Sequence, residues 1–276
     1  MGGRAAAAFA AAGRPTAGYD PVQDARSAAA ARGVAVTDAL PAAVDGAHLV
    51  LLSLPTPRHV AEVVDALAGH LAPGALVADT STIDPGTARA AARRVADAGA
   101  RYVDAPVLGR PGGVGNWTLV TGGPETDVED LAAATVGVIA KAVERVGDVG
   151  AGSTVKILNN LMFGAINAVT AEVVDLAERA GIPAARFAEA VADSGAATVS
   201  PLFRDIAPRM ATGDYDPAFT LALLRKDVGL GAALAAELGA AAEVTSAVRA
   251  LTGEAVDAGH ANQDTSALIE LLRARR

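Results

Sequence analysis

The first half of the chain alternates between short apolar runs and longer segments in which apolar residues recur every three or four positions. Short apolar runs bounded by turn residues predict buried strands, and the longer spacing predicts amphipathic helices. The predicted elements are, in chain order, helix 4–12, strand 16–19, helix 21–32, strand 34–36, a small helix 40–44, strand 48–54, helix 58–71, strand 76–79, helix 85–98, strand 101–104, a Gly/Pro-rich loop up to 116, strand 118–121 and helix 125–140. Strands that alternate with helices in this way favour a mostly parallel sheet with helices on both faces.

The second half loses the strand pattern and shows only helical spacing. The predicted helices are 154–180, 184–194, 201–211, 220–238, 243–258 and 264–274, and breaks that contain glycine separate several of them. We therefore predict two domains, an α/β domain over residues 1–150 and an all-helical domain over residues 151–276.

The chain starts at Met1-Gly2-Gly3, already at the beginning of the first predicted helix. A doubly wound nucleotide-binding domain opens with a strand and a glycine-rich turn before such a helix. Asp20 ends the next strand about twenty residues later, where an acidic residue accepts hydrogen bonds from an adenosine ribose. We expect a Rossmann-type domain whose first strand is truncated, because the natural start lies upstream or the chain has been shortened. The alternative is that Gly2-Gly3 has no role and the domain binds no nucleotide.

Composition and charge narrow the classes of partner. The chain has 276 residues and a net charge of −8, which argues against nucleic acid or an anionic membrane as a partner. It contains no cysteine, which excludes disulfides and thiolate chemistry and fits a reducing cytoplasm. The four histidines, at 48, 59, 70 and 260, show no metal-ligand spacing, so we expect no metal.

A lysine and an asparagine interrupt the most apolar segment of the chain. The sequence Gly150-Ala-Gly-Ser-Thr-Val-Lys156-Ile-Leu-Asn159-Asn160 leads into a stretch up to 174 whose composition predicts a helix buried on most sides. Lys156 and Asn160 are four residues apart and share one face of that helix. A buried ammonium is costly unless it is paired, so the two residues indicate a site for a small polar molecule. The alternative is a lysine that extends to solvent near a helix start.

The same segment has the length of a membrane span. Lys156, Asn159, Asn160, Asn167 and Glu172 interrupt it, however, and make it a poor spanning helix. We expect a core helix of a soluble protein.

Several short motifs occur in one order along the chain and together carry a family resemblance. They are Met1-Gly2, Leu54-Pro55, Asp79-Thr-Ser-Thr-Ile-Asp-Pro85, Asp104-Ala-Pro-Val107, Gly150-x-Gly-x-x-x-Lys156-x-x-Asn-Asn160, Lys226-Asp227 and Asp264-Thr-Ser-Ala267. In this order they resemble the β-hydroxyacid dehydrogenase family, which includes 3-hydroxyisobutyrate dehydrogenase, tartronate semialdehyde reductase and 6-phosphogluconate dehydrogenase. The resemblance covers essentially the whole chain. It implies an NAD(P)-dependent oxidoreductase that oxidises a hydroxyl group β to a carboxylate, or reduces the corresponding aldehyde or ketone.

The resemblance also implies roles for individual residues. Lys156 matches the catalytic lysine of the family, and Asn160 matches the amide that contacts the substrate. The residues that match cofactor-contacting positions are Gly2, Leu54, Pro55, His59, Thr82 and Lys226. The first two glycines of the family's Gly-x-Gly-x-x-Gly turn have no counterpart in this sequence.

The chemistry of hydride transfer agrees with a lysine at this position. Hydride leaves a carbinol carbon only as the hydroxyl proton departs, so a base must stand within hydrogen-bond reach of that oxygen. Lysine serves when desolvation or a nearby cation lowers its pKa toward neutrality. In the reductive direction the ammonium stabilises the developing alkoxide and donates the proton.

The sequence departs from the family after the Asp-Ala-Pro-Val motif. Related dehydrogenases usually continue with Ser-Gly-Gly, whereas this chain has Leu108-Gly109-Arg110. Leu108 removes a hydroxyl donor, while Gly109 keeps a backbone amide accessible to the substrate carboxylate. Arg110 supplies a bidentate carboxylate contact or faces solvent. We expect a substrate larger or more apolar than hydroxyisobutyrate.

Cofactor preference and assembly complete the expectations. Asp20 favours a free ribose 2′-hydroxyl, and no arginine follows it directly, so we expect NAD rather than NADP. The long apolar helix suggests a homodimer or higher oligomer, as in the family. Two alternatives stay open: an imine reductase, a class of the same architecture that generally lacks the lysine, and a non-catalytic oligomeric scaffold.

Overall fold

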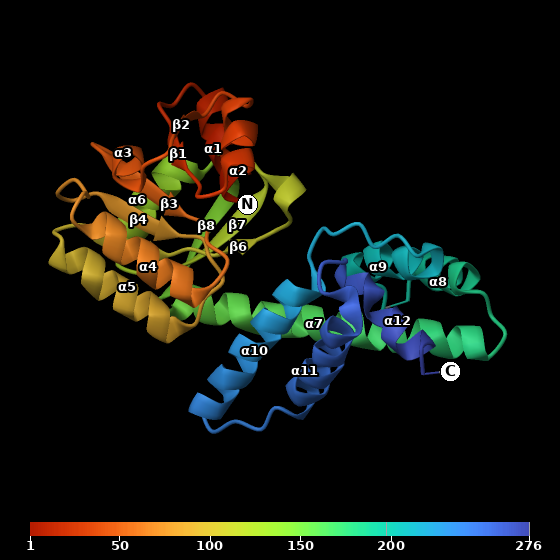
Figure 1. Ribbon diagram of the computed structural model, residues 1–276. Coiled ribbons are helices and arrows are strands. Elements are labelled where there is room, and N and C mark those ends of the chain that lie inside the picture. The colour runs from red at the N-terminus through yellow and green to blue at the C-terminus, as the bar shows by residue number, and fades with distance from the viewer. Residues whose placement is uncertain (197, 276) are drawn as a thin grey trace. The chain divides into compact units, whose positions relative to one another are not determined.

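Two units of different architecture make up the structure, a computed structural model that describes residues 1–196 and 198–275 (Figure 1). The first, Met1–Lys156, is the α/β unit, and the second, Ile157–Arg276, is the helical unit. Helix α7 (Ala151–Arg179) begins in the α/β unit and continues through the helical unit.

The α/β unit contains two sheets. The smaller sheet pairs β1 (Ala17–Tyr19) with β2 (Ala35–Thr37) in parallel. The larger sheet has the order β3-β4-β5-β7-β6, with β8 paired to β7. Its strands are β3 (Leu49–Leu52), β4 (Leu76–Asp79), β5 (Arg101–Asp104), β6 (Val107–Leu108), β7 (Trp117–Gly122) and β8 (Ala140–Gly147). Strands β3, β4 and β5 are parallel, whereas β7 runs antiparallel to β5 and β6 and parallel to β8.

Helices cover both faces of the larger sheet. The helices of this unit are α1 (Gly2–Ala11), α2 (Gln23–Ala30), α3 (Leu40–Val44), α4 (Pro57–Ala68), α5 (Pro85–Asp97) and α6 (Glu125–Thr135). On β4, Val77 packs in one core cluster with α4 and α5, which lie side by side in Figure 1. Its neighbours Leu76 and Ala78 point to the opposite face and pack with α1 and α6. Because side chains alternate along a strand, both faces are buried, and the predicted doubly wound α/β class is confirmed.

Strand β1 is separate from β3 in this arrangement. The sequence pattern predicts one continuous doubly wound sheet, whereas the β1–β2 pair forms a sheet of its own. Within the described residues, β4 is the strand paired with β3. Helix α1 lies beside the end of β3, where the backbone N–H of Gly2 donates to Ser53 Oγ at 3.1 Å.

The prediction of a helix over residues 125–140 was wrong beyond Thr135. Helix α6 ends at Thr135, and β8 begins at Ala140. Gly137 adopts a φ of +80°, a left-handed conformation that breaks the helix and turns the chain toward β7. The loop predicted up to residue 116 likewise contains the short strand β6 and one 3₁₀ turn, Pro111–Gly113.

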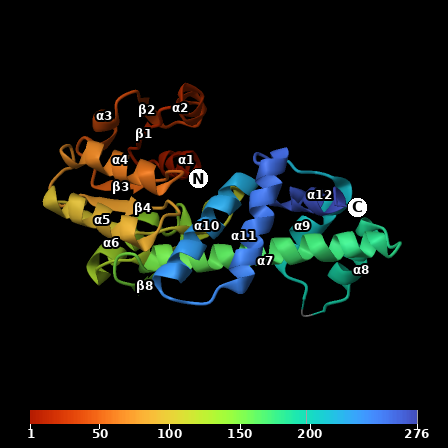
Figure 2. The ribbon, with the colours of Figure 1, turned by 60° about the horizontal axis from the view of Figure 1, so that its bottom comes forward.

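Helix α7 continues through the helical unit, and the other helices pack around it. The other helices of the unit are α8 (Ala184–Asp193), α9 (Pro201–Thr212), α10 (Leu221–Glu237), α11 (Glu243–Ala255) and α12 (Leu268–Arg273). Helices α10 and α11 pack on α7 at Gly164, where a Cβ would lie 3.2 Å from Val228 Cγ2 and 3.1 Å from Val248 Cγ1 (Figure 2). The glycine thus permits a close approach of three helices.

Helix α7 is exposed along one stripe and is buried or partly buried elsewhere, in agreement with the expectation of a helix buried on most sides. Ala168, Ala171 and Val174 lie in the core of the helical unit, but one apolar stripe of α7 is exposed. Its members Leu158, Met162, Val169 and Leu176 are 50%, 61%, 54% and 54% exposed. By length and composition α7 could also cross a membrane, a property that core helices of soluble proteins share.

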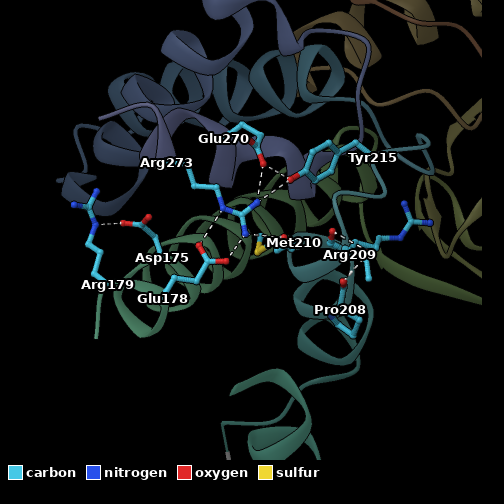
Figure 3. Close-up of polar contacts among 10 residues, drawn as sticks. Asp175, Glu178, Arg179, Pro208, Arg209, Met210, Tyr215, Glu270 and Arg273 are labelled. Carbon is cyan, nitrogen blue, oxygen red and sulfur yellow. Dashed lines mark hydrogen bonds and ion pairs between the residues drawn. The ribbon is translucent and has the colours of Figure 1, made fainter. Parts of the chain in front are cut away.

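A cluster of charged residues joins the last helix to α7 (Figure 3). Arg273 on α12 donates to both carboxylate oxygens of Glu178 on α7, at 3.1 and 2.6 Å. It also donates to Glu270 Oε1 at 2.8 Å and to the carbonyl oxygen of Met210 at 3.0 Å. The hydroxyl of Tyr215 donates to Glu270 at 2.5 Å, and burial raises the pKa of that hydroxyl. The guanidinium therefore links three segments of the helical unit.

We predict that Arg273→Met lowers the free energy of unfolding by about 2–4 kcal/mol, because it leaves two partly buried carboxylates without their shared cation. Urea denaturation followed by circular dichroism measures the change. The matched control is Arg275→Met, whose ion pair with Glu254 is about half exposed on both sides and should contribute less than about 0.5 kcal/mol. Equal losses in the two variants would contradict the prediction.

Candidate active site

Two loops meet at the carboxyl ends of β3 and β4. The backbone N–H of Leu54 donates to Ser81 Oγ at 2.8 Å, so the loop after β3 is tied to the loop that carries Thr82. Thr56 caps α4 by accepting from the backbone N–H of His59, and its Oγ1 lies 2.6 Å from the ring Nδ1 of that histidine. The structure thus brings the predicted cofactor residues Leu54, Pro55, His59 and Thr82 to one edge of the sheet. This edge is where open α/β sheets bind ligands.

Gly2 and Asp20 occupy the positions that the sequence indicated for a dinucleotide. Gly2 is the first residue of α1, and a Cβ there would lie 3.0 Å from Ser53 Cβ, so a glycine permits this close approach. Asp20 directly follows β1, and its Oδ1 accepts from the backbone N–H of Val22 at 2.9 Å. A helix N-terminus with a glycine and an acidic residue after the next strand fit a nicotinamide dinucleotide.

Arg26 lies beside Asp20, which the sequence reading did not anticipate. Its Nη1 donates to the carbonyl oxygen of Asp20 at 2.5 Å, and its Nη2 donates to Gln23 Oε1 at 2.5 Å. The available signal was its spacing of six residues from Asp20, on the helix after β1. A guanidinium here is relevant to the recognition of a ribose 2′-phosphate.

Lys156 lies in the second turn of α7, at the C-terminal border of the α/β unit. Its Nζ donates to the carbonyl oxygen of Val107 at 2.8 Å. The residue is partly buried, which lies between the two alternatives of an enclosed lysine and a lysine that extends to solvent. The ammonium is therefore held at a fixed point while part of the side chain stays accessible.

Asp104 holds the start of α7, a role that the sequence reading missed. Its carboxylate accepts from the backbone N–H of Gly150 at 2.7 Å and from that of Ser153 at 2.6 Å. The residue is 1% exposed, and burial raises its pKa, while the two amide bonds act in the opposite direction. The sequence offered a weak signal, because an acidic residue ends a predicted strand there.

A second buried carboxylate, Asp79, lies next to Asp104 in the strand register. Asp79 accepts from the backbone N–H of Ser81 at 2.9 Å and from the hydroxyl of Tyr102 at 3.1 Å. Burial raises the pKa of Asp79 and, together with the two carboxylates, raises the pKa of Tyr102 well above its usual value. Asp79 thus orders the loop that contains Ser81, whereas Asp104 orders α7.

The helical unit brings Asn160 and Lys226 together through a third carboxylate. Asn160 Nδ2 donates to Asp227 Oδ2 at 2.5 Å, and Lys226 Nζ lies 2.9 Å from Asp227 Oδ1. Asn159 Nδ2 donates to Asn160 Oδ1 at 3.2 Å, so both ends of the Asn160 amide are oriented. Asp227 is 1% exposed. The motif Lys226-Asp227 predicted a role for the lysine and none for Asp227.

The predicted substrate loop rests on the tryptophan. Trp117 is 2% exposed, and its Nε1 donates to the carbonyl oxygen of Arg110 at 2.7 Å. Gly109 has a φ of +154°, and a Cβ there would lie 2.7 Å from Trp117 Cδ1. Any larger residue at 109 would displace the ring or the loop. The side chain of Arg110 is on the exposed surface of this loop.

Comparison with known proteins identifies the family. Residues 1–147 match the family model described as "NAD binding domain of 6-phosphogluconate dehydrogenase". Residues 150–272 match the family model described as "NAD-binding of NADP-dependent 3-hydroxyisobutyrate dehydrogenase". The chain is 32% identical over 282 residues to "Probable 3-hydroxyisobutyrate dehydrogenase" of Mycobacterium tuberculosis, which covers 100% of this chain and 95% of the relative. The chain belongs to the β-hydroxyacid dehydrogenase family. The predicted enzyme class, an NAD(P)-dependent oxidoreductase of this family, is confirmed.

Solved structures agree with this assignment. The structure of Mycobacterium tuberculosis 3-hydroxyisobutyrate dehydrogenase with L-serine has a TM-score of 0.88 and 31% sequence identity, and the match covers 99% of this chain and 96% of that chain. An imine reductase from Streptomyces aurantiacus matches with a TM-score of 0.66 and 25% identity over 99% and 96% of the two chains. The dehydrogenase is thus the more similar of these two structures. The roles of the individual residues stay predictions.

Proposed function

We propose that this enzyme transfers hydride between a nicotinamide cofactor and a small 3-hydroxy acid, or its semialdehyde or ketone, with Lys156 as the general acid and base. The observation that carries the proposal is the position of Lys156 Nζ, which donates to the Val107 carbonyl oxygen at 2.8 Å. A proton-transfer group must be held within hydrogen-bond reach of the reacting oxygen, and this contact restricts the ammonium to one location.

Each proposed residue has a defined task. The nicotinamide supplies or accepts the hydride when it is bound, and Gly2, Asp20, Leu54, Pro55, His59, Thr82 and Lys226 are the proposed residues that hold the cofactor. Lys156 takes the hydroxyl proton during oxidation and returns it during reduction. Asn160 orients the same hydroxyl group, and its contact with Asp227 fixes which end of the amide is available.

We assign the substrate carboxylate to the loop that contains Gly109 and Arg110. The ring of Trp117 lies too close to Gly109 for a residue with a Cβ at that position. The guanidinium of Arg110 has two parallel donors suited to a carboxylate. Leu108 replaces a hydroxyl donor with an apolar side chain, which supports a substrate larger or more apolar than hydroxyisobutyrate. The lack of cysteine supports a reducing cytoplasm as the compartment.

We predict that Lys156→Ala lowers kcat by about 10³-fold, because it removes the proton-transfer group, while Arg110→Ala raises KM for the acid with little change in kcat. Nicotinamide absorbance with a panel of 3-hydroxy acids and cyclic imines measures both. The control is Lys141→Ala, which removes an exposed lysine of β8.

Three results would contradict the proposal in different ways. Full activity of Lys156→Ala would remove the lysine from the mechanism, and turnover of imines alone would support the imine reductase alternative. A folded protein that reacts with no substrate in the panel would support the scaffold alternative.

The preference for NAD over NADP follows from the carboxylate of Asp20, which repels a 2′-phosphate. We predict that Asp20→Ala shifts the ratio of kcat/KM for NAD over NADP toward NADP by about 10-fold, or ~1.4 kcal/mol. Arg26→Ala tests the contribution of the neighbouring guanidinium and should lower kcat/KM for NADP. Steady-state kinetics with both cofactors provides the ratios, and a wild-type preference for NADP would overturn the proposal.

The exposed stripe of α7 supports a homodimer or higher homo-oligomer. Leu158, Met162, Val169 and Leu176 are spaced by four and seven residues, so they share one face of the helix as in helix–helix interfaces. We propose that this face packs against a second copy of the chain.

We predict that Val169→Glu shifts the protein toward monomer in sedimentation velocity, because the packed face would have to desolvate a carboxylate. Val244→Glu, on α11, is the matched control, because Val244 is also exposed, at 67%. A monomeric wild type, or the same sedimentation coefficient in Val169→Glu and wild type, would rule out this interface.

A further inference from the structure

The first turns of α7 are held at two points by one short segment, Asp104–Val107. The Asp104 carboxylate binds the backbone amides of Gly150 and Ser153 at the start of the helix. Three residues later along the segment, the Val107 carbonyl accepts from Lys156 Nζ. All of these groups lie within the α/β unit.

We propose that Asp104 is a positioning residue for Lys156, acting through the N-terminus of α7. The inference rests on the proposed role of Lys156 in proton transfer. Asp104 contacts backbone amides of the helix rather than the reacting groups, so its contribution is to fix where the helix begins. A displacement of about 1 Å in a catalytic group can cost on the order of 10²-fold in rate, which makes such a constraint matter to catalysis.

Two glycines permit the close approach of Asp104 to the start of α7. An ideal Cβ on Gly152 would lie 2.7 Å from the Asp104 carbonyl oxygen, and one on Gly122 would lie 2.5 Å from Asp104 Oδ1. Both positions therefore require glycine for the helix start to reach the carboxylate. Between the two contact points, Ala105 is fully buried and Pro106 has a fixed φ, so the segment is a rigid spacer.

The backbone amides at the start of α7 favour the charged form of Asp104, whereas burial of the carboxyl disfavours it. A carboxylate at a helix N-terminus is stabilised by the orphan amides and the helix dipole. The other titratable groups near Asp104 are Asp79 on β4 and Tyr102 on β5. On the far side of Gly150, Arg89 Nη1 of α5 would lie 3.1 Å from a Cβ at that glycine, and Asp148 pairs with Arg145 just before the helix.

The test compares Asp104→Asn with Asp79→Asn. Both substitutions remove a buried carboxylate at the same register of adjacent strands, but Asp79 contacts Ser81 and Tyr102 rather than α7. We expect Asp104→Asn to lower kcat by about 10- to 100-fold, with less than about threefold change in cofactor KM. We also expect it to lower the apparent pKa of the Lys156 limb in the pH profile of kcat, because a displaced ammonium loses its hydrogen bond to the Val107 carbonyl, which favours the charged form.

Asp79→Asn should lower Tm by about as much as Asp104→Asn does, but it should not move the Lys156 limb of the pH profile. This difference separates positioning of the lysine from general destabilisation. Asp104→Ser, which retains a short acceptor for a helix N-terminus, provides the same comparison if the asparagine variant does not fold. A folded Asp104 variant with wild-type kcat and pH profile would overturn the inference while Lys156→Ala remains inactive. Activity in Lys156→Ala would instead overturn the proposed function.

Discussion

The buried contact between the Asp104 carboxylate and the first amides of α7 is the constraint on which the site depends. A carboxylate at the end of a buried strand has few ways to satisfy its oxygens, and a helix N-terminus offers unpaired amides. The amides therefore donate hydrogen bonds to the buried carboxylate, and the carboxylate accepts from amides that the helix leaves unpaired. Lys156 is only two turns into the helix. The contact that supplies hydrogen bonds to the buried carboxylate therefore also fixes the position of the helix turn that carries the lysine.

The same solution recurs at Asp79 and Asp227. Each is nearly or fully buried: Asp79 accepts from the hydroxyl of Tyr102 on β5, and Asp227 accepts from the side-chain amide of Asn160 on α7. Removing one partner from such a group leaves the other desolvated, so these contacts specify geometry more strictly than apolar packing does. The proposed active-site residues are thus oriented by carboxylates that do not themselves stand in the reaction.

Much of the fold could be predicted because it depends on local pattern. Strands β4 and β5 and the small helix α3 begin and end where the sequence indicated, because turn residues or a helix end lie beside each of them in the sequence. Strand β8 was missed because its exposed face is polar and it follows a helix without a strong boundary before Gly137. Its position is set by pairing with β7, a contact that no local pattern reports.

The sequence predicted the residues of the candidate site better than the hydrogen bonds and ion pairs that join them. The motif order pointed to Lys156, Asn160 and Lys226, but the partners of Asp104 and Asp227 lie 46 and 67 residues away in the chain. The exposed stripe of α7 was hidden for a related reason, because composition alone does not tell an apolar face that packs within one chain from a face that a second chain covers.

The placement of Trp117 makes the proposed substrate loop open to direct observation. It is the only tryptophan in the sequence, it is buried, and its indole N–H is bonded to the loop at Arg110. Indole emission depends on such a hydrogen bond and on the polarity around the ring. The protein therefore carries an intrinsic optical reporter beneath the loop, and changes in loop conformation can be followed without a label and without turnover.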